Sequence, residues 1–269
     1  MPFFICTTCG TQYAESAQPP ADCRICGDER QYVGLGGQHW TLLELMLDEH
    51  ENHLEAVAPG ITSVETRPTF AIGQRALLVQ HPAGNVLWDC VSFVDQETVD
   101  SLAALGGVSA IAISHPHFYS SMVEWSQAFG DAPIYLHNSD APWVSRPDPR
   151  VTFWAGETYP MADGLSLVRC GGHFDGSSVL HVAGSAERRG ALLTGDTVKV
   201  GWDRLSVSVM RSYPNLIPVG PTALAHVERV LAPLDYDDIH GAWTGHSIRG
   251  DAKAIVARSL ARYRQVIAE

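Results

Sequence analysis

The stretch Ile113-Ser-His-Pro-His-Phe-Tyr-Ser-Ser121 places two histidines, His115 and His117, two residues apart at the end of an apolar run. The run begins at Val108 as "VSAIAIS" and is continuously apolar, which is typical of a strand buried on both faces. A His-x-His pair is weak evidence for a metal site by itself, because this chain contains 12 histidines. Whether the pair binds a metal depends on whether the rest of the chain supplies further ligands.

The composition is that of an ordinary globular protein. The chain has 269 residues, of which 45% are hydrophobic and 18% charged, so it can bury a full core. With 18 Lys and Arg against 30 Asp and Glu, the net charge is -12, which disfavours nucleic acid as a partner. The sequence shows neither a membrane-spanning run nor a signal peptide. We therefore expect a cytoplasmic protein that acts on a small molecule without a membrane, and homo-oligomerisation stays open.

Two matched Cys-x-x-Cys-Gly motifs contain Cys6 and Cys9, and Cys23 and Cys26. Four thiolates at this spacing complete a tetrahedral site, for which zinc is the default ion, and each following glycine suits a left-handed turn. About thirty residues cannot fold on their own core, so the metal should supply folding energy. Two disulfides are the alternative, which a reducing compartment disfavours. The motifs also resemble those of rubredoxins, where iron occupies four thiolates, and we expect a structural zinc ribbon at residues 1–36.

The segment after the ribbon has apolar residues near helical spacing. In "QHWTLLELMLDEHENHLEAV", which starts at Gln38, Leu45 and Met46 are followed by Leu54 and Val57. This pattern predicts a helix over residues 37–58 that links the ribbon to a main domain at residues 59–269.

The main domain changes to short strands joined by turns. "RALLVQ" and "VLWDC" flank a turn and predict a hairpin. A helix is expected from Ser120 to Phe129, with Ser121 and Glu124 as a capping box, and a one-faced helix is expected from Asp251 to the end of the sequence. The late strands carry a glycine-flanked histidine, a Gly-Asp pair and a His-Gly pair.

In order and spacing, these motifs resemble the metallo-β-lactamase superfamily over about residues 60–269. The resemblance implies an α/β fold, the four-layered αβ/βα sandwich, with a metal site at the ends of strands from two similar halves. The positions that match its motifs are Asp89 behind the ligands, His115, His117 and His173 as metal ligands, Asp196 as the bridging aspartate and His240 as the late histidine.

The chain departs from this family where the His-x-His-x-Asp-His signature should end. Tyr119 and Ser120 stand in place of the aspartate and histidine, which leaves too few ligands for a tight second ion. We therefore expect one ion at this site, zinc or else iron or manganese. Whether His240 or His246 completes the site is left open by the sequence.

The resemblance implies a hydrolase that uses a metal-activated water. Asp196 would ligate the ion or deprotonate the water, while Tyr119 would donate to a developing oxyanion or else fill the space of the second ion. His240 would act as a distal ligand or a hydrogen-bond donor to substrate. Small-molecule esters, thioesters, lactones or amides are the expected substrates, and phosphodiesters rank lower because of the negative charge. A catalytically degenerate metal-binding or regulatory module is the alternative.

Overall fold

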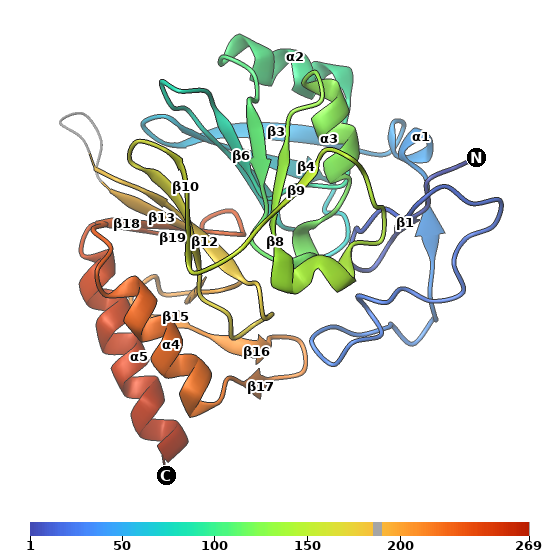
Figure 1. Cartoon of the computed structure of the whole chain (residues 1–269). Helices are drawn as coiled ribbons and strands as arrows, with labels where there is room; N and C mark the ends of the chain where they lie inside the picture. The colour runs from blue at the N-terminus through green and yellow to red at the C-terminus, as the bar shows by residue number, and fades with distance from the viewer. Residues whose placement is uncertain (185–189, 269) are drawn as a thin grey trace. The chain divides into compact units, whose positions relative to one another are not determined.

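The computed structural model describes residues 1–184 and 190–268. The chain consists of two compact units, each with more contacts within itself than to the other. Unit 1 contains Met1–Leu136 and Ala141–Phe153, and unit 2 contains His137–Asp140 and Trp154–Glu269. Within the described residues, the two large sheets have the strand orders β3-β4-β5-β6-β7-β8-β9 and β10-β11-β12-β13-β18-β19 (Figure 1). The protein is thus of the mixed α/β class that the sequence predicts.

The elements of unit 1 begin with the ribbon and continue into the first sheet. In chain order they are β1 (Ile5–Cys6), β2 (Trp40–Thr41), α1 (Leu43–Met46), β3 (Glu51–Ala58), β4 (Ile61–Arg67), β5 (Arg75–Val79), β6 (Val86–Trp88), α2 (Gln96–Ala104), β7 (Ala110–Ala112), η1 (Pro116–Phe118), α3 (Met122–Ala128), β8 (Ile134–His137) and β9 (Val151–Trp154). The 3-10 helix η2 (Asn138–Trp143) follows β8.

Neighbouring strands of unit 1 change from antiparallel to parallel at β6. Strands β3 to β6 pair as antiparallel hairpins, whereas β6 with β7 and β7 with β8 are parallel. Parallel neighbours end at the same edge of a sheet. The residues that follow β6 and β7, including Asp89 and Ser114, are therefore brought together at that edge.

The predicted linking helix over residues 37–58 is wrong. Only the single turn α1 is helical, and Glu51–Ala58 is a strand that pairs antiparallel with β4. The turn at Pro59-Gly60 sets this hairpin, and Gly60 has the positive φ of 72° that the turn requires. Pairing with β4 therefore outweighs the weak helical spacing of Leu54 and Val57, and the side chain of His53 is exposed on β3.

Other local predictions for the main domain are confirmed, with one exception. Strands β5 and β6 form the expected antiparallel hairpin, and α5 starts directly after Asp251. Helix α3 is present, but Ser121 makes no side-chain capping hydrogen bond, so the predicted capping box is absent. The side chain of Ser121 is fully buried, whereas Glu124 bonds Arg146 instead of the helix end.

Unit 2 is built around the second sheet and two helices. Its elements are β10 (Thr158–Ala162), β11 (Leu165–Arg169), β12 (Ser178–Val182), β13 (Ala191–Gly195), β14 (Lys199–Val200), β15 (Val207–Ser208), β16 (Met210–Ser212), β17 (Ile217–Pro218), α4 (Pro221–Leu231), β18 (Asp238–Gly241), β19 (Ser247–Arg249) and α5 (Ala252–Ala268). A core cluster of aliphatic side chains from α4 and α5 packs with those of β12, β13 and β18. The described helices include none of the length and apolar character needed to cross a membrane.

Candidate metal centres

Two groups of buried side chains among the described residues could hold a metal ion. The first group is Cys6, Cys9, Cys23 and Cys26, all within unit 1. The second group has three histidines and an aspartate, which are His115 and His117 of unit 1 and His173 and Asp196 of unit 2. These are the two ligand sets that the sequence predicts. The histidines of unit 1 and the ligands of unit 2 are described separately below.

The four cysteines have the sulfur spacing of a tetrahedral thiolate site. The Sγ atoms of Cys6 and Cys26 lie 3.6 Å apart, as do those of Cys9 and Cys23, and all four sulfurs lie within 4.8 Å of one another. Zinc with Zn–S bonds of about 2.3 Å requires S···S distances of about 3.8 Å, so the donor set fits this ion. All four cysteines are free thiols, which excludes the disulfide alternative in this structure.

Hydrogen bonds around the sulfurs show how the two motifs turn. The N–H of Gly10 donates to the carbonyl of Cys6, and Gly10 has a φ of +82°, as the left-handed turn predicts. Gly27 also donates to Cys23, but without a positive φ, so that part of the expectation is wrong. Gln38 Nε2 donates to Cys6 Sγ at 3.1 Å, which favours the thiolate form.

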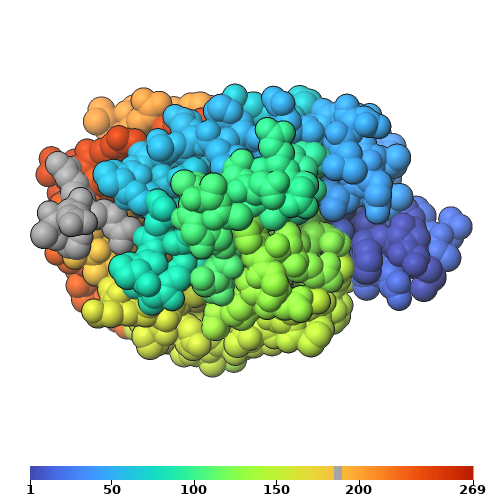
Figure 2. Space-filling view, turned by 90° about the horizontal axis from the view of Figure 1, so that it is seen from above, coloured from blue at the N-terminus to red at the C-terminus, as the bar shows by residue number. Residues whose placement is uncertain are grey.

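The ribbon contacts the rest of unit 1 through its backbone. The N–H of Gln12 donates to the carbonyl of Ser120 at 3.1 Å, and Ser92 Oγ donates to the carbonyl of Gly10 at 2.8 Å. Figure 2 shows the dark blue N-terminal residues against the blue and green surface of the same unit. The ribbon is therefore joined to the segment that follows His117.

His115 and His117 lie on the turn that follows β7, and both are buried. Pro116 occupies the first position of η1, where its fixed φ suits a helical start, and the two imidazole rings meet edge to face at 5.1 Å. Ser114 Oγ lies 2.8 Å from His115 Nδ1. This contact fixes the orientation of the ring, as is usual for metal-binding histidines.

Asp89 stands behind this turn. Its carboxylate accepts the backbone N–H of Ser114 at 2.7 Å, and Asp89 itself is buried with a φ of +60°. A non-glycine residue in the left-handed region carries strain, which is commonly found at functional sites. The carboxylate thus holds the start of the His-x-His segment and does not need to be a ligand.

Tyr119 and Ser120 occupy the positions where the family signature has its last two ligands. Tyr119 is buried at the end of η1. Ser120 has a φ of +43°, accepts a hydrogen bond from Gln74 and donates one to the carbonyl of Cys90. The hydroxyl of Ser120 is therefore committed to the core of unit 1.

In unit 2, His173 lies on a glycine-rich turn between β11 and β12. Gly171 and Gly172 both have positive φ, which lets the chain turn back sharply before β12. His173 Nδ1 lies 2.9 Å from the carbonyl of Met210. A carbonyl only accepts, so Nδ1 carries the proton and Nε2 presents its lone pair.

Asp196 follows β13 and is 5% exposed. Its Oδ1 has no hydrogen-bond partner among the described residues. Burial raises the pKa of this carboxyl to about 7, against a smaller opposite effect of Lys199. A buried carboxylate oxygen of this kind is costly unless a proton or a cation neutralises it, so the donor set fits a metal ion.

His240 and His246 differ in their surroundings. His240 lies in β18, fully buried, with Nδ1 3.1 Å from Ser247 Oγ. His246 packs edge to face on Trp202 and Trp243, with Nδ1 near the carbonyl of Thr244. His240 is therefore held in the core of unit 2, whereas His246 belongs to an aromatic cluster.

That aromatic cluster extends from His173 to the surface of unit 2. The ring of Tyr213 lies 5.7 Å from that of His173, and Lys199 Nζ lies 4.6 Å from the Tyr213 ring and 4.0 Å from the Trp243 ring. Trp202, in the turn between β14 and β15, is 89% exposed. These residues form an aromatic rim beside the unit 2 ligands.

The comparisons with solved structures identify the fold. VMB-1 has a TM-score of 0.61 at 14% identity, over 81% of this chain and 99% of that one. The metallo-β-lactamase from Pontibacter korlensis has a TM-score of 0.58 at 16% identity, over 81% and 100%. TTHA1623, solved in a di-iron-bound form, has a TM-score of 0.52 at 22% identity, over 73% and 97%. The chain therefore has the metallo-β-lactamase fold, as its motifs predict.

A relative in sequence assigns the chain more narrowly. The uncharacterized protein YmaE of Bacillus subtilis (strain 168) is 47% identical over 265 residues, which cover 98% of this chain and 96% of YmaE. The chain belongs to the same family as YmaE. No profile of a known protein family matches the chain.

Several residues around the candidate ligands were missed by the sequence reasoning. Ser114 directly precedes His115, so a polar residue at the end of a buried strand was an available signal. The Met210 carbonyl and the Tyr213 ring reach His173 only through the fold of unit 2, and nothing in the local pattern marks them. His137, at the end of β8, lies 3.1 Å through Nε2 from the carbonyl of Gly156 and accepts the N–H of Ser139 at Nδ1.

Proposed function

We propose that this protein is a metal-dependent hydrolase that binds one ion through His115, His117, His173 and Asp196. The observation that carries the proposal is the buried carboxyl of Asp196, whose Oδ1 lacks a partner among the described residues. The contacts of Nδ1 in His115 and His173 support it, because they fix the orientation of both rings, as is usual for metal-binding histidines. The metallo-β-lactamase fold also supports it.

The reaction would use groups that the chain already positions. A bound zinc, iron or manganese ion lowers the pKa of a coordinated water and so supplies hydroxide near neutral pH. Asp196 would orient that nucleophile or take its proton. Tyr119 would donate a hydrogen bond to the oxyanion, and His240 would donate to the substrate.

We propose a single ion because Tyr119 and Ser120 stand at the two positions where the family signature has ligands for a second ion. Ser120 is bonded to Gln74 and to the carbonyl of Cys90, so its hydroxyl is turned to the core. Tyr119 offers a phenol, which is a poor ligand for zinc in place of a carboxylate. We propose zinc in the four-cysteine site, where the ion has a structural role.

The substrate class follows from the surroundings of the unit 2 ligands. Trp243, Tyr213 and the exposed Trp202 provide flat apolar surface, which suits a small molecule with an apolar acyl or aryl group. An ester, thioester, lactone or amide of this kind is therefore favoured over a phosphodiester, since the chain carries a net charge of -12.

The test combines metal content with activity. Elemental analysis of the purified protein should give two ions per chain, and His117→Ala should lose one of them together with activity on a panel of acetyl and aryl esters, thioesters and lactones. His181→Ala is the matched control, because His181 bonds the Asp235 carbonyl away from both ligand sets. We expect the control to keep both ions and full activity.

A binding or regulatory module without catalysis is the second candidate, because both positions at the end of the family signature are changed. Two ions per chain with no turnover of any ester, thioester, lactone, amide or phosphodiester would favour that module over the hydrolase. One ion, retained in His117→Ala and lost in Cys9→Ala, would contradict metal binding at the histidines.

A further inference from the structure

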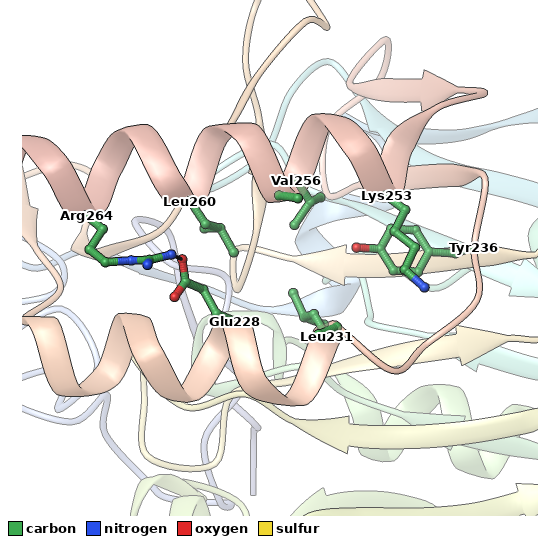
Figure 3. A pocket seen from close by; sticks show the side chains of 9 residues that line it. Glu228, Leu231, Tyr236, Lys253, Val256, Leu260 and Arg264 are labelled. Atoms are coloured by element: carbon green, nitrogen blue, oxygen red, sulfur yellow. Dashed lines mark hydrogen bonds and ion pairs between the residues drawn. The ribbon is translucent and has the colours of Figure 1, made fainter.

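A groove lies between helices α4 and α5 of unit 2, apart from the residues of either metal set. Its volume is about 320 Å³, within the range of small-molecule sites, and it is drawn in Figure 3. The lining side chains come from both helices and from the segment after α4; they are Glu228, Leu231, Ala232, Tyr236, Lys253, Val256, Ala257, Leu260 and Arg264.

The floor of the groove is apolar. Leu231, Val256 and Leu260 line the groove and belong to the packed core cluster of unit 2, so their positions are fixed. Ala232 and Ala257 are small and exposed, which leaves the space between the helices open. Such a floor would hold a short aliphatic chain.

Tyr236 supplies a polar group within this apolar site. Its side chain is 3% exposed, and its hydroxyl has no hydrogen-bond partner among the described residues. Figure 3 shows the hydroxyl directed into the groove, near Val256. A buried tyrosine usually has its hydroxyl bonded, so this donor is available to a ligand.

The charges around the groove favour an anion at the same end. Lys253 lines the groove beside Tyr236 and makes no ion pair in the described part of the chain. At the other end, Arg264 is paired with Glu228, so the charge of that acid is compensated (Figure 3). Along Ala252–Ala268, helix α5 carries four cations and no acid, in a chain of net charge -12.

We infer that this groove binds a small amphipathic carboxylate. The carboxylate accepts a hydrogen bond from the Tyr236 hydroxyl and is attracted by the charge of the Lys253 ammonium, which lines the same end of the groove, and the aliphatic chain lies over Leu231, Val256 and Leu260. This site is independent of the metal centres, because all of its residues lie on α4, on α5 or on the segment between α4 and β18.

The test measures binding of octanoate to the purified full-length protein by calorimetry. Octanol tests the need for the charge, and acetate tests the need for the chain. We expect octanoate to bind, and both octanol and acetate to bind at least about tenfold more weakly, since a charged hydrogen bond and a buried aliphatic chain each contribute more than this factor.

Variants identify the site. Lys253→Gln and Tyr236→Phe should each weaken octanoate binding about tenfold. Arg258→Gln removes an exposed cation of the same helix that does not line the groove, and it should leave binding unchanged. Ala257→Trp should fill the groove and abolish binding, whereas Ala254→Trp, on the same helix but outside the lining, should not.

Three results would overturn the inference. They are no octanoate binding by the wild-type protein, equal binding of octanol and octanoate, or equal loss of affinity in Lys253→Gln and Arg258→Gln. Melting temperatures of all the variants separate a failure to fold from a loss of the site, because the exposed positions 253, 254, 257 and 258 tolerate substitution.

Discussion

The four-cysteine set and the histidine–aspartate set are both buried, but the chain assembles them differently. All four cysteines lie in the first 26 residues, and two tight turns are enough to bring their sulfurs within 4.8 Å. The second set depends on strand ends in both units, with His115 after β7 and Asp196 after β13. The first site is therefore made by local geometry, and the second by the fold.

The two sites also differ in what stabilises them. Around the cysteines, the buried apolar cluster contains only Ile25 besides the sulfurs, with Tyr13, Trp40 and Trp143 packed against it. Such a small cluster offers little apolar burial, so we propose that a bound metal ion supplies part of the folding energy of the ribbon. The sheets that carry the histidines and Asp196 are held by cores of their own.

The largest expected effect is therefore on the ribbon. Cys9→Ala should lose one ion and unfold residues 1–36, because structural zinc contributes about 10 kcal/mol or more to small thiolate modules. Limited proteolysis and elemental analysis would measure both changes. Cys170→Ala, a buried cysteine of the unit 2 core, is the control and should keep both ions.

If Cys9→Ala keeps a protease-resistant ribbon, the contacts of Gln12 and Gly10 with unit 1 hold it without metal. The ribbon would then depend on the fold of unit 1, and the contrast between a local site and a fold-dependent site would be wrong.

This contrast also explains how far the sequence could be interpreted. The cysteine spacing predicted a complete site, and the order of Asp89, His115, His173 and Asp196 predicted the fold. The helix over residues 37–58 failed because β4, the other strand of the same hairpin, decides the conformation of Glu51–Ala58. Contacts such as Met210 with His173 depend on the fold of unit 2 and leave no local pattern.

The effect of intermediate size is a pH dependence of the free energy of unfolding. Asp196 should cause it, and only in the metal-free protein. Burial raises its pKa to about 7 from 3.8, so between these values the folded state holds a proton that the unfolded state has released. The free energy of unfolding should therefore fall as pH rises, by about 2–3 kcal/mol from pH 5 to pH 8. Urea unfolding with a chelator measures this.

Asp196→Asn should remove that pH dependence, because the amide stays neutral throughout. Asp235→Asn, at an exposed position in the same unit, is the control and should behave as the wild-type protein. An equal pH slope in the wild-type protein and in Asp196→Asn would show that Asp196 already has a compensating partner, and it would weaken the case for a cation there.

The smallest effect compares one orienting hydrogen bond at each site. Ser114→Ala removes the contact with His115 Nδ1 and should weaken metal binding about 10- to 100-fold, as is usual for groups that orient a ligand. Gln38→Ala removes the donor to Cys6 Sγ and should weaken the ribbon ion by no more than about fivefold, because four thiolates remain in place. Competition with a chromophoric chelator resolves the two ions.

A larger loss of metal affinity in Gln38→Ala than in Ser114→Ala would show that the cysteine site depends on its surroundings as much as the histidine set does. That result would contradict the division into a local and a fold-dependent site.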